Sequence, residues 1–186
     1  MGIIIAFVIL GVIIVGIVSG GVAIYNRLVM LKYNVDKNFA NIDVILKQRV
    51  DEIPNLIAVV KKTQGYEESL LNQLTELRTA FLSSRSTDEK VQLANEVGKL
   101  LNSFFAVSEN YPELKAVESF RTLQLRVSDL EDMLSDRLEL YNASVNMYNI
   151  GIHEMPALLF ARPMGYTDKP LLHISEEEKK YDGIRF

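Results

Sequence analysis

The chain has 186 residues, enough for one domain and an anchor, and its 20 Lys and Arg against 24 Asp and Glu give a formal net charge of −4. This mildly acidic balance disfavours nucleic-acid binding, which needs a basic face. The chain has no cysteine, which excludes disulfides, cysteine-ligated zinc and thiol catalysis. Every charged side chain lies beyond residue 24, so the first 24 residues form a separate segment.

The N-terminal segment is apolar from residue 3 to residue 24, apart from one serine. As a helix it would be about 33 Å long, enough to cross the hydrocarbon core of a bilayer. A cleaved signal peptide is the alternative, with Gly21-Val22-Ala23 as its cleavage site. The missing basic residues ahead of the run, and the length of the run, argue against cleavage. We predict an uncleaved transmembrane anchor over residues 1–24.

The anchor also predicts an orientation, because Arg27, Lys32 and Lys37 follow it and no basic residue precedes it. Basic flanks stay on the cytoplasmic side of a membrane, so we expect the large C-terminal domain there.

One face of the anchor carries small side chains, which are Gly16, Ser19, Gly20 and Ala23. The two glycines have the G-x-x-x-G spacing that lets two membrane helices approach closely. We therefore expect a homo-oligomer, with cyclic closure as the default arrangement of identical subunits.

Beyond the anchor, apolar residues recur at steps of three and four from Leu31 to residue 60, which predicts one helix continuing the membrane helix. Pro54 lies inside this helix. It lacks a backbone N–H and crowds the carbonyl of Val50, so a kink is expected near residues 50–54.

Three further helices are predicted, over residues 66–82, from Ser86 onward, and over residues 117–152. Ser86 and Glu89 have the spacing of a capping box, in which each side chain bonds the other residue's backbone. Pro112 stands where a first helical turn would begin.

The predicted fold is all-α, with the N-terminal transmembrane helix continuing into an elongated antiparallel helical bundle of about four helices. A free coiled coil is the alternative, but the short middle helices favour a closed bundle. Leu134 falls on the predicted core face and Glu131 on a different face. Leu134→Asp should therefore destabilise the fold strongly, and Glu131→Ala should be nearly silent.

After the last long helix comes an apolar segment, residues 155–166, that is too short to span a membrane. It is expected either to lie as a strap on a neighbouring subunit or membrane surface, or to close the end of the bundle as a lid. Its candidate interaction residues are Met155, Pro156, Leu158, Leu159, Phe160 and Tyr166. The remaining tail includes a charge run, Ser175 to Lys180, which is typical of solvated or disordered chain.

Asparagines recur along the two long helices. An amide near a helix seam can fix register, and the alternative is that these side chains are simply exposed. They are Asn38, Asn41, Asn55, Asn142, Asn146 and Asn149.

No group of residues predicts chemistry. His153-Glu154 lacks the second histidine of a zinc-protease helix. The glycines beyond the anchor are single, and the serines have no histidine or lysine partner at motif spacing. We expect no enzymatic activity, no cofactor and no metal.

Several strings in order resemble the LemA family of small bacterial membrane proteins, over about residues 25–166. They are Tyr25–Val29, Ile53–Leu56, Glu109–Ala116, Tyr141-Asn142, Tyr148-Asn149 and the late Pro156. The chain departs from the family pattern at Met155, where the family has phenylalanine, and at Gly165-Tyr166 in place of Gly-Phe. The resemblance implies a helical bundle on a single-pass anchor in the bacterial inner membrane. For some relatives it implies association with specialised membranes such as magnetosomes, and it implies no reaction.

The sequence therefore favours a non-enzymatic scaffold with an anchor (1–24), a helical bundle (25–166) and a C-terminal tail (167–186). Its expected partners are membrane lipid, further copies of itself and an unidentified protein, with no nucleic acid. The alternative is a monomeric membrane-tethered adaptor or regulator of a membrane protease or sensor.

Overall fold

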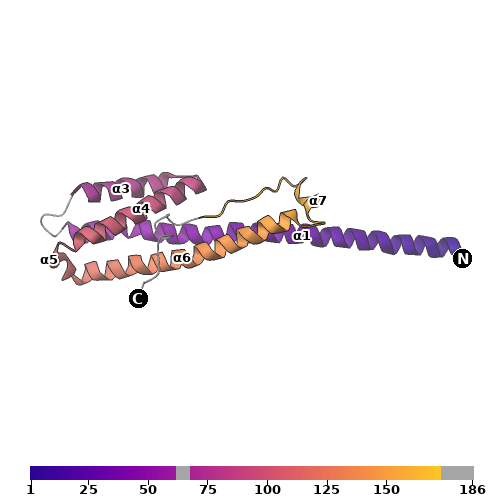
Figure 1. Ribbon diagram of the computed structural model, residues 1–186, viewed down its shortest axis with the longest axis horizontal. Coiled ribbons are helices and arrows are strands. Elements are labelled where there is room, and N and C mark those ends of the chain that lie inside the picture. The colour runs from indigo at the N-terminus through magenta and orange to yellow at the C-terminus, as the bar shows by residue number, and fades with distance from the viewer. Residues whose placement is uncertain (62–67, 173–186) are drawn as a thin grey trace, which may run out of the picture. The chain divides into compact units, whose positions relative to one another are not determined.

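The computed structural model describes residues 1–61 and 68–172, and all regular structure in them is helical (Figure 1). The all-α prediction is therefore confirmed. The helices are α1 (Gly2–Asp51), α2 (Ile53–Val60), α3 (Glu68–Ser83), α4 (Thr87–Ser108), α5 (Pro112–Lys115), α6 (Glu118–His153) and α7 (Leu158–Ala161). The predicted start of the second helix at Tyr66, and the charge run from Ser175 to Lys180, lie outside the described residues.

The chain divides into two compact units, and helices α1 and α6 contribute to both. The first unit is formed by Met1–Ala40 with Glu139–Leu172. The second contains Asn41–Leu138 among the described residues.

In the first unit, α1 changes character along its length. Among the described residues one helix is long and apolar enough to cross a membrane, and its apolar window is not covered by protein. Farther along α1, Leu28 and Val35 are fully buried. There α6 runs antiparallel to α1: a methyl group at Gly151 would collide with Leu31, and Asn38 reaches back to the Leu140 carbonyl. One unbroken helix thus serves as the apolar N-terminal stretch and as part of a packed core.

In the second unit, the buried side chains follow the predicted helical steps. The core face of α6 is a stripe that comprises Phe120, Leu123, Val127, Leu134 and Leu138. Phe104 of α4 lies against Phe120, with ring centroids 6.3 Å apart. Deletion of such buried rings or branched side chains typically costs about 2–5 kcal/mol, so this stripe accounts for much of the unit's stability. Pro112 begins α5, as predicted.

The helical pattern is interrupted at Glu52, between α1 and α2. The Glu52 amide bonds the Arg49 carbonyl three residues back (3.3 Å), and regular four-residue bonding resumes at Leu56. Pro54, in the first turn of α2, has no N–H to offer the Val50 carbonyl. The interruption lies where the proline predicts a distortion, and the bend itself stays a prediction.

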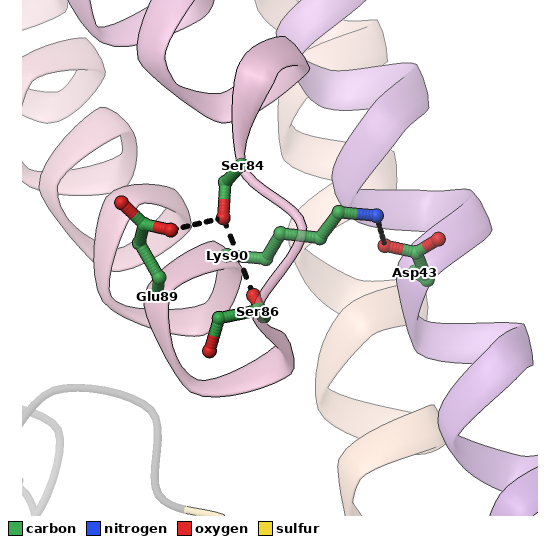
Figure 2. Close-up of polar contacts among 5 residues, drawn as sticks. All are labelled: Asp43, Ser84, Ser86, Glu89 and Lys90. Carbon is green, nitrogen blue, oxygen red and sulfur yellow. Dashed lines mark hydrogen bonds and ion pairs between the residues drawn. The ribbon is translucent and has the colours of Figure 1, made fainter.

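The capping box expected at α4 does not form. Ser86 is the N-cap residue of α4, but it makes no side-chain capping bond. The Glu89 carboxylate instead accepts a hydrogen bond from the Ser84 hydroxyl (2.6 Å), which also lies 3.3 Å from the Ser86 carbonyl (Figure 2). Beside it, Lys90 forms an ion pair with Asp43 of α1 (2.9 Å). The prediction was wrong: Ser86 makes no side-chain capping bond, and the Glu89 carboxylate accepts from the Ser84 side chain.

Candidate functional site

The segment after α7, residues 167–172, is non-helical and lies against α6 through two asparagines. Asn149 donates from its amide to the Lys169 carbonyl and accepts from the Lys169 N–H, both at 2.9 Å. Asn142 makes the same pair of bonds with Leu172, at 2.8 and 2.9 Å. Each side-chain amide therefore binds one backbone residue as a neighbouring β-strand would. We call these two residues the asparagine clamp.

The spacing of the asparagine clamp matches the segment that it holds. Seven residues of α-helix rise about 10.5 Å, and three residues of extended chain span about 10 Å. The order of contacts is opposite, so the segment runs antiparallel to α6. Pro170, which has no N–H, falls between the two clamped residues, where neither asparagine bonds its backbone. The clamp thus requires backbone N–H groups at two positions a fixed distance apart. It places no requirement on the side chains of the residues between those positions.

Charged and aromatic contacts surround the clamp. Lys169 pairs with Asp36 of α1 at 2.7 Å and lies over the Tyr148 ring, 5.8 Å from its centroid. His153 lies 3.0 Å from Asp168, and both side chains are exposed. Exposed ion pairs contribute little, about 0–1 kcal/mol each, so the neutral clamp carries more of the attachment.

Tyr148, between the two asparagines, is buried. Burial raises the pKa of the Tyr148 phenol above its usual value of 10.0, and the nearby Tyr166 and the carboxylates of Asp168 and Asp36 raise it further. The hydrogen bond to the Thr167 backbone acts in the opposite direction. The phenol therefore stays protonated at physiological pH, so Tyr148 fills space beneath the segment and carries no charge.

The asparagines of the two long helices thus fall into groups with different contacts and exposure, and the sequence pattern did not distinguish these groups. Asn142 and Asn149 are half-buried and hold chain from outside the helices. Asn55 donates to Glu52 at 2.9 Å, whereas Asn41 and Asn146 are exposed. Neither register fixing nor simple exposure describes the clamp.

The apolar segment of residues 155–166 folds back within the first unit. Its buried side chains are Ala157 and Ala161. The Phe160 ring approaches α1 so closely that a Cβ at Gly21 would stand 3.5 Å from it. Leu158 and Tyr166 are half-buried, and the exposed members are Met155, Pro156 and Leu159. Contact of this segment with a neighbour or a membrane stays a prediction.

No part of the described chain covers the small-residue face of the anchor at Gly16 and Gly20. A Cβ at Gly16 or Gly20 would meet open space, and Ala23 is exposed. The Ser19 hydroxyl donates to the Gly16 carbonyl within the same helix (3.0 Å).

Two ion pairs of opposite polarity join α1 and its continuation to α6 in the second unit. Arg49, which is buried, pairs with Glu131 of α6. Glu52, also buried, pairs with Arg126 at 2.7 Å. A methyl group at Gly98 of α4 would press on the Arg49 guanidinium, so glycine there makes room for it. Glu131 neutralises a buried charge, so the pairing predicts a destabilising effect of its removal, where the position on the helix alone predicts a silent one.

Residues 38–186 match the LemA family. This chain belongs to the LemA family. Among curated proteins it is similar to the magnetosome proteins MamQ 1 and MamQ 2 of Paramagnetospirillum magneticum, at 23% identity over 158 residues, which is 71% of this chain and 58% of each relative. It is also similar to the magnetosome protein MamQ of Magnetospirillum gryphiswaldense, at 20% identity over 175 residues, which is 80% of this chain and 64% of the relative. The LemA-family chain therefore spans about 58–64% of the length of these relatives.

The two Tyr-Asn pairs that carry the resemblance to the LemA family lie on α6, and their asparagines are the two that bind residues 167–172, the docked segment. Tyr141 and Tyr148 are buried, and the asparagine after each one holds the backbone. Among the described residues there is no group of three or more His, Asp or Glu side chains that could hold a metal ion. The clamp is an architectural site that binds peptide backbone.

Proposed function

We propose that this LemA-family protein is a non-enzymatic, membrane-anchored helical scaffold that self-associates in the inner membrane of a bacterium. The observation that carries the proposal is the continuity of α1. Its exposed apolar N-terminal stretch and its buried Leu28 and Val35 belong to one helix without a break. Such a helix holds the packed core around Leu28 and Val35 at a fixed distance from the bilayer, whereas a flexible tether would not. The similarity to magnetosome proteins of two bacteria supports a place on a bacterial membrane.

Self-association is supported by the direction of the small-residue face. A helix turns about 100° per residue, so Gly16 and Gly20 point roughly 90° away from Leu28 and Val35. The face that packs within the first unit and the face with small residues are therefore distinct. The second face stays open for another membrane helix.

The test is the particle mass by light scattering in mild detergent, after subtraction of bound detergent. We expect an oligomer for the wild type and a smaller particle for Gly16→Leu with Gly20→Leu. Gly11→Leu is the matched control, because Gly11 also faces open space but lies on another side of the helix. A monomeric wild type would overturn the scaffold and favour the membrane-tethered adaptor. An oligomer that survives the double change would move the contact away from the anchor.

The large domain is proposed to lie on the cytoplasmic side, because Arg27, Lys32 and Lys37 follow the anchor. The chain has no cysteine, so a single cysteine at the exposed Ser135 reports its side without background. Ser135→Cys should resist a membrane-impermeant maleimide in intact cells and react after lysis. Reaction in intact cells would reverse the orientation.

The absence of catalysis is part of the proposal and rests on the chemistry of the polar side chains. The asparagine clamp consists of neutral amides bonded to backbone. Of the carboxylates beside it, Asp36 pairs with Lys169 and Asp168 lies 3.0 Å from the His153 ring nitrogen. These groups hold chain in place and offer neither a nucleophile nor a poised base.

A further inference from the structure

Residues Met155 to Ala161 form a turn followed by the short helix α7, and we call this turn and helix the hairpin. It lies beside the part of α1 that is proposed to enter the membrane. The Phe160 ring is in van der Waals range of a Cβ built at Gly21. Figure 1 shows α7 alongside α1, with the indigo N-terminal stretch of α1 extending beyond it. The hairpin is thus positioned by a contact with the anchor itself.

The contact at Gly21 fixes the level of the hairpin. Gly21 comes three residues before Ile24, the last residue of the apolar run, which places it about 4.5 Å inside that run. Arg27 lies a similar distance outside the run and pairs with Glu154, which precedes the hairpin, at 2.8 Å. The boundary between the apolar and the charged level therefore falls between the Phe160 contact and the Arg27–Glu154 pair.

The hairpin presents apolar side chains at this level that the first unit does not cover. Met155 is 69% exposed and Leu159 is 63% exposed. Tyr25 is half-exposed at the same height on α1, and Arg162, directly after α7, is exposed. Apolar side chains bordered by an aromatic ring and cations are typical of elements that lie in the interface of a bilayer.

We propose that the Met155–Ala161 hairpin is a second membrane-contacting element, with Met155 and Leu159 inserted at the boundary between the lipid headgroups and the acyl chains. This inference rests on α1 crossing the membrane and goes beyond it. The membrane would then hold the chain at two places, the anchor and the inserted hairpin beside it, which we call the wedge. The wedge would fix the rotation of α1 about its own axis. The occupant of the exposed apolar patch is lipid, because the anchor that fixes the patch's level is itself in lipid.

Tryptophan fluorescence tests the proposal cleanly, since the chain contains no Trp. Leu159→Trp in the full chain is reconstituted into phosphatidylcholine–phosphatidylglycerol vesicles whose acyl chains are brominated either near the headgroup or near the chain end. We expect about twofold or stronger quenching by lipid brominated near the headgroup, and weaker quenching by lipid brominated near the chain end. Met155→Trp is the second reporter and should behave in the same way.

Two control variants separate the wedge from the anchor. Leu140→Trp changes a leucine of similar exposure (50%) in the same unit, level with Asn38 of α1, which lies about 21 Å beyond Ile24. It should show almost no quenching. Ile13→Trp, in the middle of the apolar run, should be quenched most by lipid brominated near the chain end.

The outcomes are distinguishable. If Leu159→Trp and Met155→Trp are quenched no more than Leu140→Trp while Ile13→Trp is quenched, the wedge is overturned and the anchor stands. Blue-shifted emission in that case would place a second copy over the patch instead of lipid. If Ile13→Trp is not quenched either, the anchor falls, and the wedge falls with it.

Discussion

Removal of the Glu131 carboxylate tests the charge arrangement inside the second unit. Glu131 pairs with Arg49, whose side chain is only 5% exposed, so Glu131→Ala leaves a buried guanidinium without that carboxylate. Arginine does not deprotonate in proteins, so the buried positive charge persists after this carboxylate is removed. We expect a strong loss of stability from a substitution that touches no part of the apolar stripe.

The magnitude follows from the burial of the two partners. Breaking a fully buried ion pair typically costs about 3–5 kcal/mol. The Glu131 side chain is 30% exposed, so water reaches its side of the pair and we expect about 2–3 kcal/mol. For a domain of this size, that corresponds to a fall in Tm of about 5–10 °C.

The assay is thermal and urea unfolding of the full chain in detergent, followed by circular dichroism. Asp132→Ala is the matched control: it removes a carboxylate from the adjacent, exposed position of α6. It should shift Tm by about 1–2 °C or less, as surface changes usually do. Arg49→Met combined with Glu131→Leu should recover much of the loss, because an apolar pair of similar volume needs no counter-charge. Equal effects of Glu131→Ala and Asp132→Ala would refute the reasoning.

Three further substitutions test the core, the helix interruption and the docked segment. Leu134→Asp puts a charge at a position only 3% exposed and should cost several kcal/mol, measured as loss of cooperative unfolding. Pro54→Ala should restore the backbone bond to Val50 and raise the helical circular dichroism signal slightly; a loss of helicity would assign the proline to packing. The Tyr148 pKa is raised above 10.0 in the folded state. The contribution of the neutral phenol to the stability of the fold is therefore complete below pH 10 and is lost as the pH rises through the folded-state pKa. Amide exchange in residues 167–172, corrected for intrinsic rates, should therefore accelerate above pH 10 in the wild type and less so in Tyr148→Phe.

The sequence alone was sufficient to predict the helices whose buried residues recur at the helical period. The stripe on α6 was predicted from steps of three and four, and Phe120, Val127 and Leu134 are all buried. The period is reliable here because the helix is long and one face meets apolar neighbours throughout. The interruption at Glu52 was also foreseen in place, since proline acts on its own backbone and needs no distant partner.

Contacts between residues far apart in the sequence could not be predicted in the same way. Arg49 and Glu131 are 82 positions apart, and each taken alone is a charged residue on an amphipathic helix. Their pairing depends on the antiparallel packing of α1 and α6, and the space for it depends on Gly98 from a third helix. The capping-box error has a different cause, because the Ser84 hydroxyl, two residues before the N-cap, comes within reach of the Glu89 carboxylate through the geometry of the turn.

The asparagine clamp shows why a family motif can be visible in a sequence while its purpose is hidden. Side-chain pairs leave complementary residue types in a sequence, whereas the partner of Asn142 and Asn149 is backbone, which every residue carries. The sequence shows the clamp only through its spacing, since two helical turns match three extended residues. This arrangement leaves the residues between the clamped positions free to differ, provided that both clamped residues keep an N–H. Residues 167–172 therefore belong to the folded first unit by hydrogen bonding, although their composition resembles that of a solvated tail.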